Sequence, residues 1–173
     1  MAILVVFGSI EGQSEKIADF IANLATKTGQ QVEIFDTADL VAEVDWGNFE
    51  TVALVASVHE RRHPKAFEVF LSSHKRELSE RKVLLISVSL RVAFEEGQEE
   101  AQDYLDEMKL RTGINPDREL LVAGAIRSRS YDYFATQILR HVVLRGHDFD
   151  PTEREHEFTD WSKLDADVRA FLN

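Results

Sequence analysis

Short apolar runs alternate with amphipathic segments along most of this chain. Each run is too short for a helix and has the length of a strand that is buried on both faces, as strands of parallel sheets are. The pattern predicts strands over Ala2–Phe7, Gln31–Phe35, Thr51–Ser57, Lys82–Ser87 and Glu119–Ala125. Helical spacing begins at Ser14 and recurs over Pro64–Arg76 and Glu95–Arg111. This alternation predicts an α/β fold with right-handed crossovers and helices on both faces of a parallel sheet.

Composition narrows the range of functions. The 173 residues, of which 44% are hydrophobic and 29% charged, fit one soluble domain spanning residues 1–173. The absence of cysteine excludes disulfides, thiolate metal sites and iron–sulfur clusters, so any redox chemistry needs a bound cofactor. The net charge of −11 argues against general nucleic-acid binding. No signal peptide or spanning helix is evident, so we expect a cytoplasmic protein.

The loop Gly8–Ser14 joins the first predicted strand directly to a helix. Its backbone N–H groups, two serine hydroxyls and the positive end of the helix dipole suit a phosphate group. The loop matches neither the dinucleotide fingerprint nor the P-loop. The spacing of Ser9, Gly12 and Ser14 resembles the flavodoxin loop that holds the phosphate of FMN. The alternative is an ordinary tight turn, in which Ser14 caps the helix and Gly12 supplies an unusual φ.

Basic residues gather in the loops that follow the later predicted strands. In an open parallel sheet these loops meet at the carboxyl edge, where ligands bind. The basic residues are His59, Arg61, Arg62, His63, Arg91, Arg127 and Arg129, with Glu60 the only acid among them. We expect a basic rim around a ligand site, and scattered surface charge is the alternative.

The segment His59-Glu60-Arg61-Arg62-His63 is a literal H-E-x-x-H, the motif of zinc peptidases. That chemistry needs both histidines on one helical face and a glutamate that polarises a zinc-bound water. Here the motif directly follows a buried strand, and Pro64 disfavours a helical conformation at His63. We therefore expect no metal site, and a zinc metallopeptidase is a remote alternative.

Several short motifs recur in the order and spacing of one known family. They are Gly12-Gln13-Ser14, Ala56-Ser57-Val58, Ala66-Phe67, Ser87-Val88-Ser89-Leu90, Gly124-Ala125-Ile126-Arg127 and Thr159-Asp160-Trp161. Over nearly its whole length the chain resembles the flavodoxin-type, menaquinone-dependent protoporphyrinogen IX dehydrogenases. The resemblance implies a flavodoxin-like, doubly wound sheet of five parallel strands in the order 2-1-3-4-5.

The same resemblance implies that FMN is the cofactor, and the Ser9–Ser14 loop predicts FMN rather than FAD or NAD. Its phosphate would lie on the Gly8–Ser14 loop, and its ring would lie between the loops after the third and fourth strands. The implied cofactor-binding residues are Ser9, Ile10, Glu11, Gly12, Gln13, Ser14, Ser57, Val58, His59, Ser87, Val88, Ser89, Leu90 and Arg91.

Members of that family oxidise protoporphyrinogen IX to protoporphyrin IX in haem synthesis and pass the electrons to membrane quinones. The resemblance implies a porphyrinogen substrate, a quinone acceptor and at most peripheral contact with the inner face of the cell membrane. Arginine suits the propionate carboxylates of a tetrapyrrole, and the candidates are Arg61, Arg62, Arg127 and Arg129. His59 is the nearest candidate for a catalytic base. A soluble flavodoxin-like electron carrier or an accessory flavodoxin-domain protein is the alternative.

Two amphipathic segments follow the last predicted strand, Tyr131–Arg145 and Trp161–Leu172. A flavodoxin fold needs only one helix there. If the second segment closes the sheet, the first is an extra helix whose apolar face is available to a quinone, a porphyrin or a second copy in a homo-oligomer. The alternative is that both helices pack on the core.

Overall fold

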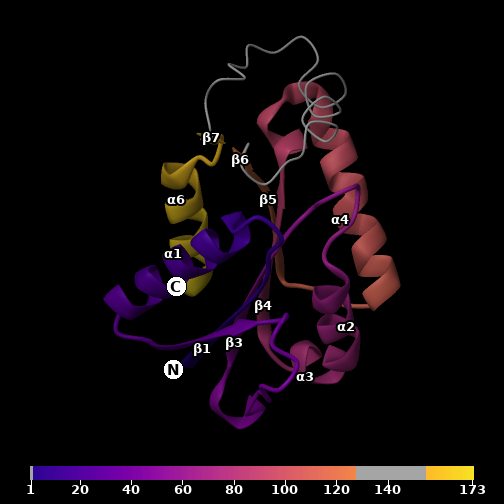
Figure 1. The fold of residues 1–173 in the computed structure, drawn as a ribbon. Coiled ribbons are helices and arrows are strands. Elements are labelled where there is room, and N and C mark those ends of the chain that lie inside the picture. The colour runs from indigo at the N-terminus through magenta and orange to yellow at the C-terminus, as the bar shows by residue number, and fades with distance from the viewer. Residues whose placement is uncertain (1, 128–154) are drawn as a thin grey trace.

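The computed structural model describes residues 2–127 and 155–173 of the chain. A sheet of five parallel strands runs through the centre of the molecule in the order β2-β1-β3-β4-β5 (Figure 1). The strands are β1 (Ala2–Gly8), β2 (Gln31–Asp36), β3 (Thr51–Ser57), β4 (Lys82–Ser89) and β5 (Arg118–Ala123). The predicted flavodoxin-like fold and strand order are confirmed.

Helices cover both faces of the sheet. The α-helices are α1 (Gln13–Lys27), α2 (Lys65–Ser73), α3 (Lys75–Ser79), α4 (Gln98–Thr112) and α6 (Trp161–Leu172), and the short 3-10 helices are η1 (Trp46–Asn48), η2 (Leu90–Ala93) and η3 (Glu95–Gly97). Helices α1 and α6 lie on one face, and α2, α3 and α4 lie on the other (Figure 1). None of the helices in the described ranges is long and apolar enough to cross a membrane.

Each strand of the sheet centre contributes to two cores, because successive side chains of a strand point to opposite faces. On β1, Ile3 and Val5 pack with α1 and α6, whereas Leu4 and Val6 pack with α2, α3 and α4. All four side chains are buried. This two-sided burial explains why the central strands are uninterrupted apolar runs in the sequence.

Three predicted elements are divided in the structure. The helix expected over Glu95–Arg111 begins with η3, and α4 starts only at Gln98. The helix expected over Pro64–Arg76 is split at His74 into α2 and α3. The strand expected over Glu119–Ala125 ends at Ala123, and Gly124 separates it from β6 (Ala125–Arg127). β6 leaves the parallel sheet and pairs antiparallel with β7 (Glu155–Glu157), a pairing that the sequence pattern did not predict.

The C-terminal helix α6 closes the sheet, as expected for the Trp161–Leu172 segment. Leu164, Val168 and Phe171 are buried in the core beside α1, and the Trp161 ring lies 5.0 Å from the ring of Phe20. The other predicted helix, Tyr131–Arg145, lies outside the described residues. Its role therefore stays a prediction.

Candidate functional site

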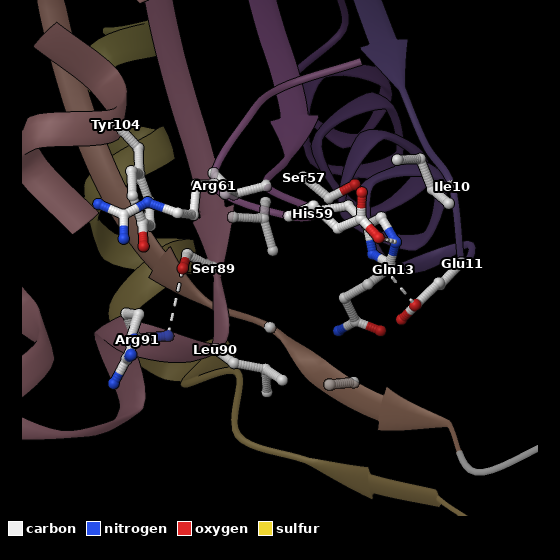
Figure 2. A pocket seen from close by; sticks show the side chains of 15 residues that line it. Ile10, Glu11, Gln13, Ser57, His59, Arg61, Ser89, Leu90, Arg91 and Tyr104 are labelled. Carbon is white, nitrogen blue, oxygen red and sulfur yellow. Dashed lines mark hydrogen bonds and ion pairs between the residues drawn. The ribbon is translucent and has the colours of Figure 1, made fainter. Parts of the chain in front are cut away.

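A cavity of ≈ 280 Å³ opens at the carboxyl edge of the sheet, between the loops that follow β1, β3, β4 and β5 (Figure 2). This is the position at which open parallel sheets bind ligands. The lining residues are Ile10, Glu11, Gln13, Ser57, Val58, His59, Glu60, Arg61, Val88, Ser89, Leu90, Arg91, Tyr104, Gly124 and Ala125. Figure 2 shows two ends, with Arg61, Tyr104 and Arg91 at one and Ile10, Glu11 and Gln13 at the other.

The Glu11 end of the cavity is formed by the turn from β1 into α1. Gly12 adopts φ +91°, in the left-handed region, and α1 begins at the next residue without a side-chain cap. Ser9 Oγ accepts a hydrogen bond of 2.8 Å from the Gly12 N–H. Ser14 does not cap the helix, because it already lies in the first turn. The uncapped N–H groups of α1 leave this end suited to an anion.

Two buried hydroxyls near the cavity have no hydrogen-bond partner within residues 2–127 and 155–173. They are Ser14 Oγ in the first turn of α1 and Ser57 Oγ at the end of β3. A buried hydroxyl without a partner costs free energy, and native proteins rarely contain one. Both hydroxyls could therefore bond a polar ligand that lies in the cavity beside the start of α1 and the end of β3.

The C-terminal segment holds the first turn of α1 in place. Gln13 Nε2 donates a hydrogen bond of 2.9 Å to Thr159 Oγ1, which itself donates to the backbone oxygen of Ala123 at 2.6 Å. Lys16 Nζ lies 2.5 Å from a carboxylate oxygen of Glu157. Sequence spacing does not reveal the contacts of Gln13 and Lys16, because these two contacts join residues more than 140 positions apart.

Glu11 and His59 lie close together, away from the end of the cavity formed by Arg61, Tyr104 and Arg91 (Figure 2). Glu11 Oε1 lies 3.7 Å from His59 Nδ1. The two residues come from the loops after β1 and β3, which are neighbouring strands. A protonated His59 would therefore offset the negative charge of Glu11.

The H-E-x-x-H segment forms a turn and not a helix. The backbones of His59 and Arg62 exchange hydrogen bonds of 2.8 and 3.0 Å, and Glu60 and Arg61 between them adopt φ of +47° and +68°. Positive φ at both central residues is typical of a two-residue hairpin turn. His63 is buried and its Nε2 lies 2.8 Å from Ser87 Oγ. The two histidines thus do not share a helical face.

Burial of the His63 imidazole has an electrostatic consequence. Desolvation disfavours the charged ring and lowers the pKa of His63 to about 4. Ser87, its partner, points to this buried side and does not line the cavity. Among the described residues, no group of three histidine, aspartate or glutamate side chains could hold a metal ion.

Arg62 points away from the cavity, although Arg61 next to it lines the wall. Arg62 Nη2 lies 3.1 Å from Glu68 Oε2, and Arg111 Nη2 lies 2.6 Å from Glu68 Oε1. Burial alone would raise the pKa of Glu68, but the hydrogen bonds from Arg111 and Arg62 hold it below its ordinary value. Arg62 therefore belongs to an ion-pair network around the buried Glu68, beside α2 and α4.

At the other end of the cavity, Glu100 holds two arginines. Arg91 Nε lies 2.9 Å from Glu100 Oε2, and Arg61 Nη1 lies 3.8 Å from Glu100 Oε1. Tyr104 Oη donates a hydrogen bond to Glu100, and the Arg61 guanidinium lies 5.7 Å from the centre of the Tyr104 ring. Burial, together with this carboxylate, raises the pKa of Tyr104 to about 12. Tyr104 is therefore a neutral donor at physiological pH.

The structure brings together most of the residues that the sequence indicated. Eleven of them line the cavity: Ile10, Glu11, Gln13, Ser57, Val58, His59, Arg61, Val88, Ser89, Leu90 and Arg91. Ser9, Gly12 and Ser14 form the turn behind it, whereas Ser87 and Arg62 face buried partners. Arg129 and the side chain of Arg127 lie outside the described part of the chain.

Four lining residues were not predicted from the sequence. Glu60 was noted as an acid among basic residues and as the glutamate of the H-E-x-x-H motif, and Gly124 and Ala125 were assigned to a strand. Tyr104 lies on α4 and had no sequence signal, since an aromatic residue on an amphipathic helix reads as core. Only the position of α4 beside the loop after β4 brings Tyr104 to the cavity.

Comparisons with known proteins find relatives that match nearly the whole chain. The chain is 24% identical over 165 residues to the protoporphyrinogen IX dehydrogenase (quinone) of Escherichia coli (strain K12), covering 95% of this chain and 91% of that one. It is 25% identical over 173 residues to the protein of the same name from Leishmania major, covering 98% of this chain and 72% of that one.

Solved structures share the fold. Oxidised flavodoxin 1 from Bacillus cereus superimposes with a TM-score of 0.53 at 19% identity, covering 82% of this chain and 99% of that one. The Fusobacterium nucleatum flavodoxin bound to flavin mononucleotide gives 0.52 at 14% identity, covering 99% and 94%. The family model of the flavodoxin domain matches residues 4–152. This chain therefore belongs to the flavodoxin domain family.

Proposed function

We propose that this protein is an FMN-dependent oxidoreductase that oxidises a porphyrinogen of the protoporphyrinogen IX type and passes the electrons to a quinone. The observation that carries the cofactor is the pair of buried hydroxyls without a partner in the described residues, Ser14 Oγ in the first turn of α1 and Ser57 Oγ at the end of β3. The FMN-bound flavodoxin neighbour supports the same cofactor. The relatives from Escherichia coli and Leishmania major support the substrate and the acceptor.

The cavity suits the two chemically different ends of FMN. The uncapped N-terminus of α1 and the Ser14 hydroxyl suit the phosphate dianion. Val58 and Leu90 provide apolar surface for the ring, and Ser57 Oγ provides a polar partner. When bound, FMN supplies the hydride-accepting group that protein side chains lack.

Glu11 and His59 form the acid–base pair of the proposed reaction. Oxidation of a porphyrinogen releases protons, so the site needs a group that accepts them. His59 lines the cavity, and a ring nitrogen of its imidazole can accept a proton there. Glu11 Oε1, 3.7 Å from His59 Nδ1, would stabilise the imidazolium that forms when His59 accepts a proton.

The cofactor assignment is tested by comparing FMN with riboflavin, which lacks the phosphate. We expect FMN to bind at least about tenfold more tightly in a fluorescence titration. Gly12→Asp should abolish this difference, because it adds a carboxylate to the anion site. Gly29→Asp is the matched control, since Gly29 also has a positive φ but lies beyond the other end of α1. Equal affinity for the two flavins would contradict the proposal.

The reaction is tested anaerobically with protoporphyrinogen IX and a menaquinone analogue. We expect porphyrin fluorescence to develop only when FMN-loaded protein and quinone are both present. His59→Asn should lower the rate at least about tenfold, because it removes the proton acceptor. FMN-loaded protein that exchanges electrons with a flavodoxin reductase but leaves the porphyrinogen unchanged would instead be an electron carrier.

A further inference from the structure

Three separate elements bring two guanidinium groups to one wall of the cavity. Arg61 comes from the turn after β3 and Arg91 from η2 after β4, while Glu100 reaches them from α4. We infer that Arg61 and Arg91 form a carboxylate-binding subsite that selects acidic substrates. This subsite adds to the proposed function the residues that bind the substrate's carboxylates, and the identity of that substrate rests on the proposed function.

The wall has an excess of positive charge. Two guanidinium groups share the single carboxylate of Glu100, which is their only ion-pair partner among the described residues. Glu100 itself does not line the cavity. The acids that do are Glu11, which faces His59 at the opposite end, and Glu60, which is exposed and lies 4.0 Å from His59 Nε2. An anionic group is therefore favoured at the arginine end.

Both arginines keep donors for an incoming carboxylate. A guanidinium has five N–H donors, and the contact of Arg91 with Glu100 uses Nε. The two terminal nitrogens of Arg91 can thus pair with a second carboxylate in the bidentate geometry that arginine prefers. Arg61 meets Glu100 at the longer distance of 3.8 Å, so its guanidinium is held more loosely and can turn to the same ligand.

The backbone and neighbouring groups orient this pair. The Arg61 guanidinium lies over the Tyr104 ring, and the Tyr104 hydroxyl donates to Glu100. Tyr104 therefore stabilises both the positive charge of Arg61 and the negative charge of Glu100. The backbone N–H of Arg91 donates to Ser89 Oγ at 3.2 Å. The Arg91 side chain is 23% exposed and that of Arg61 is 76% exposed. Arg91 is accordingly the inner, stronger contact and Arg61 the outer one.

The neighbouring arginine shows that this arrangement is specific. Arg62 has the same charge and adjoins Arg61 in the sequence, but it pairs with buried Glu68 and does not line the cavity.

The arginine wall and the apolar lining together fit a ligand that is a flat, largely apolar ring with a carboxylate on its edge. The carboxylate would meet Arg91 and Arg61 at the cavity wall, and the ring would extend from there toward the proposed flavin site. A tetrapyrrole with propionate side chains has this chemistry.

The test measures equilibrium binding rather than turnover. The probes are mesoporphyrin IX, which carries two carboxylates, and its dimethyl ester, which has the same ring without the charges. Wild-type protein loaded with FMN should bind the diacid at least about tenfold more tightly than the ester. Arg91→Gln should weaken diacid binding about tenfold and Arg61→Gln several-fold, and neither should change binding of the ester.

Arg62→Gln is the matched control, and it should leave the diacid affinity within twofold of wild type. If the Arg61→Gln/Arg91→Gln double variant binds the diacid as tightly as wild type, or if wild type does not prefer the diacid, the subsite is wrong. The same titrations are run without FMN, because the arginines line the cavity in the protein alone. A protein that binds no FMN contradicts the proposed function, and its diacid titration still decides the subsite.

Discussion

Gln13 Nε2 and Thr159 Oγ1 lie 2.9 Å apart, although 146 positions separate the two residues. Both side chains are buried, and Thr159 also donates to the backbone oxygen of Ala123, where β5 ends. This contact fastens the first turn of α1 to the segment that leads into α6. The proposed phosphate site is therefore held by the C-terminal part of the chain.

Thr159→Val keeps the side-chain shape and removes the hydroxyl. The first turn of α1 should then be held less firmly, and FMN affinity should fall several-fold in a fluorescence titration. The free energy of unfolding should fall by about 1–2 kcal/mol, because two hydrogen bonds are lost. Thr26→Val is the control, since Thr26 Oγ1 donates to Ala22 O further along α1. It should alter stability without altering FMN affinity, and an equal loss of affinity would contradict this role of Thr159.

Buried His63 predicts a pH dependence of stability. The imidazole has an ordinary pKa of 6.5 in the unfolded chain and about 4 in the folded protein, chiefly because of desolvation. Between these values the unfolded state binds more protons, so stability falls as the pH falls from about 6.5 to about 4. The loss from this group is up to about 3 kcal/mol.

Urea denaturation at several pH values checks this dependence. His63→Gln lacks the titrating ring, so its stability should not show this loss. The stability advantage of wild type over His63→Gln should therefore shrink as the pH falls from about 6.5 to about 4. Ser87→Ala removes the hydrogen-bond partner but keeps the buried ring, so it should retain the wild-type dependence. A dependence that persists in His63→Gln would assign it to another group.

The Glu68 network predicts a large effect of one charge. Glu68→Gln leaves Arg62 and Arg111 without their shared carboxylate, and Glu68 is nearly buried. The free energy of unfolding should fall by about 2–3 kcal/mol. Glu80→Gln, which breaks an exposed pair with Arg76, should cost less than about 1 kcal/mol. Similar losses in the two variants would show that burial does not strengthen the Glu68 contacts.

Gly97 predicts a link between backbone packing and the arginine wall. A Cβ at this position would lie 2.3 Å from the backbone oxygen of Arg91, so an alanine must displace η2 or η3. Gly97→Ala should lower stability by about 1–3 kcal/mol and weaken binding of a dicarboxylic porphyrin. Gly47→Ala is the control, because its Cβ would have only one contact, at 3.4 Å from Asp45 Oδ1. If Gly97→Ala is as stable as wild type, the backbone around Arg91 can move to make room for the added Cβ without a cost in stability.

The sequence by itself determined the sheet and the position of the site. Strands buried on both faces must be continuous apolar runs, so Thr51–Ser57 is bounded correctly from the sequence alone. The anion-binding turn before α1 is also local, since Gly12 and the helix N-terminus are neighbours in sequence. Because the carboxyl ends of parallel strands meet at one edge, the strand assignments alone brought the loops after β1, β3 and β4 together.

Only the tertiary structure decided where the side chains of those loops point. His59 to His63 match a helical metal motif in sequence, but two positive φ values turn the chain and bury His63 against Ser87. Arg61 and Arg62 are chemically identical, yet Glu100 and Glu68 draw them to opposite sides. These partners lie on α4 and α2, and their distance from the loop depends on how helices pack on the sheet. Local residue patterns do not contain that distance, because packing joins segments that are far apart in the chain.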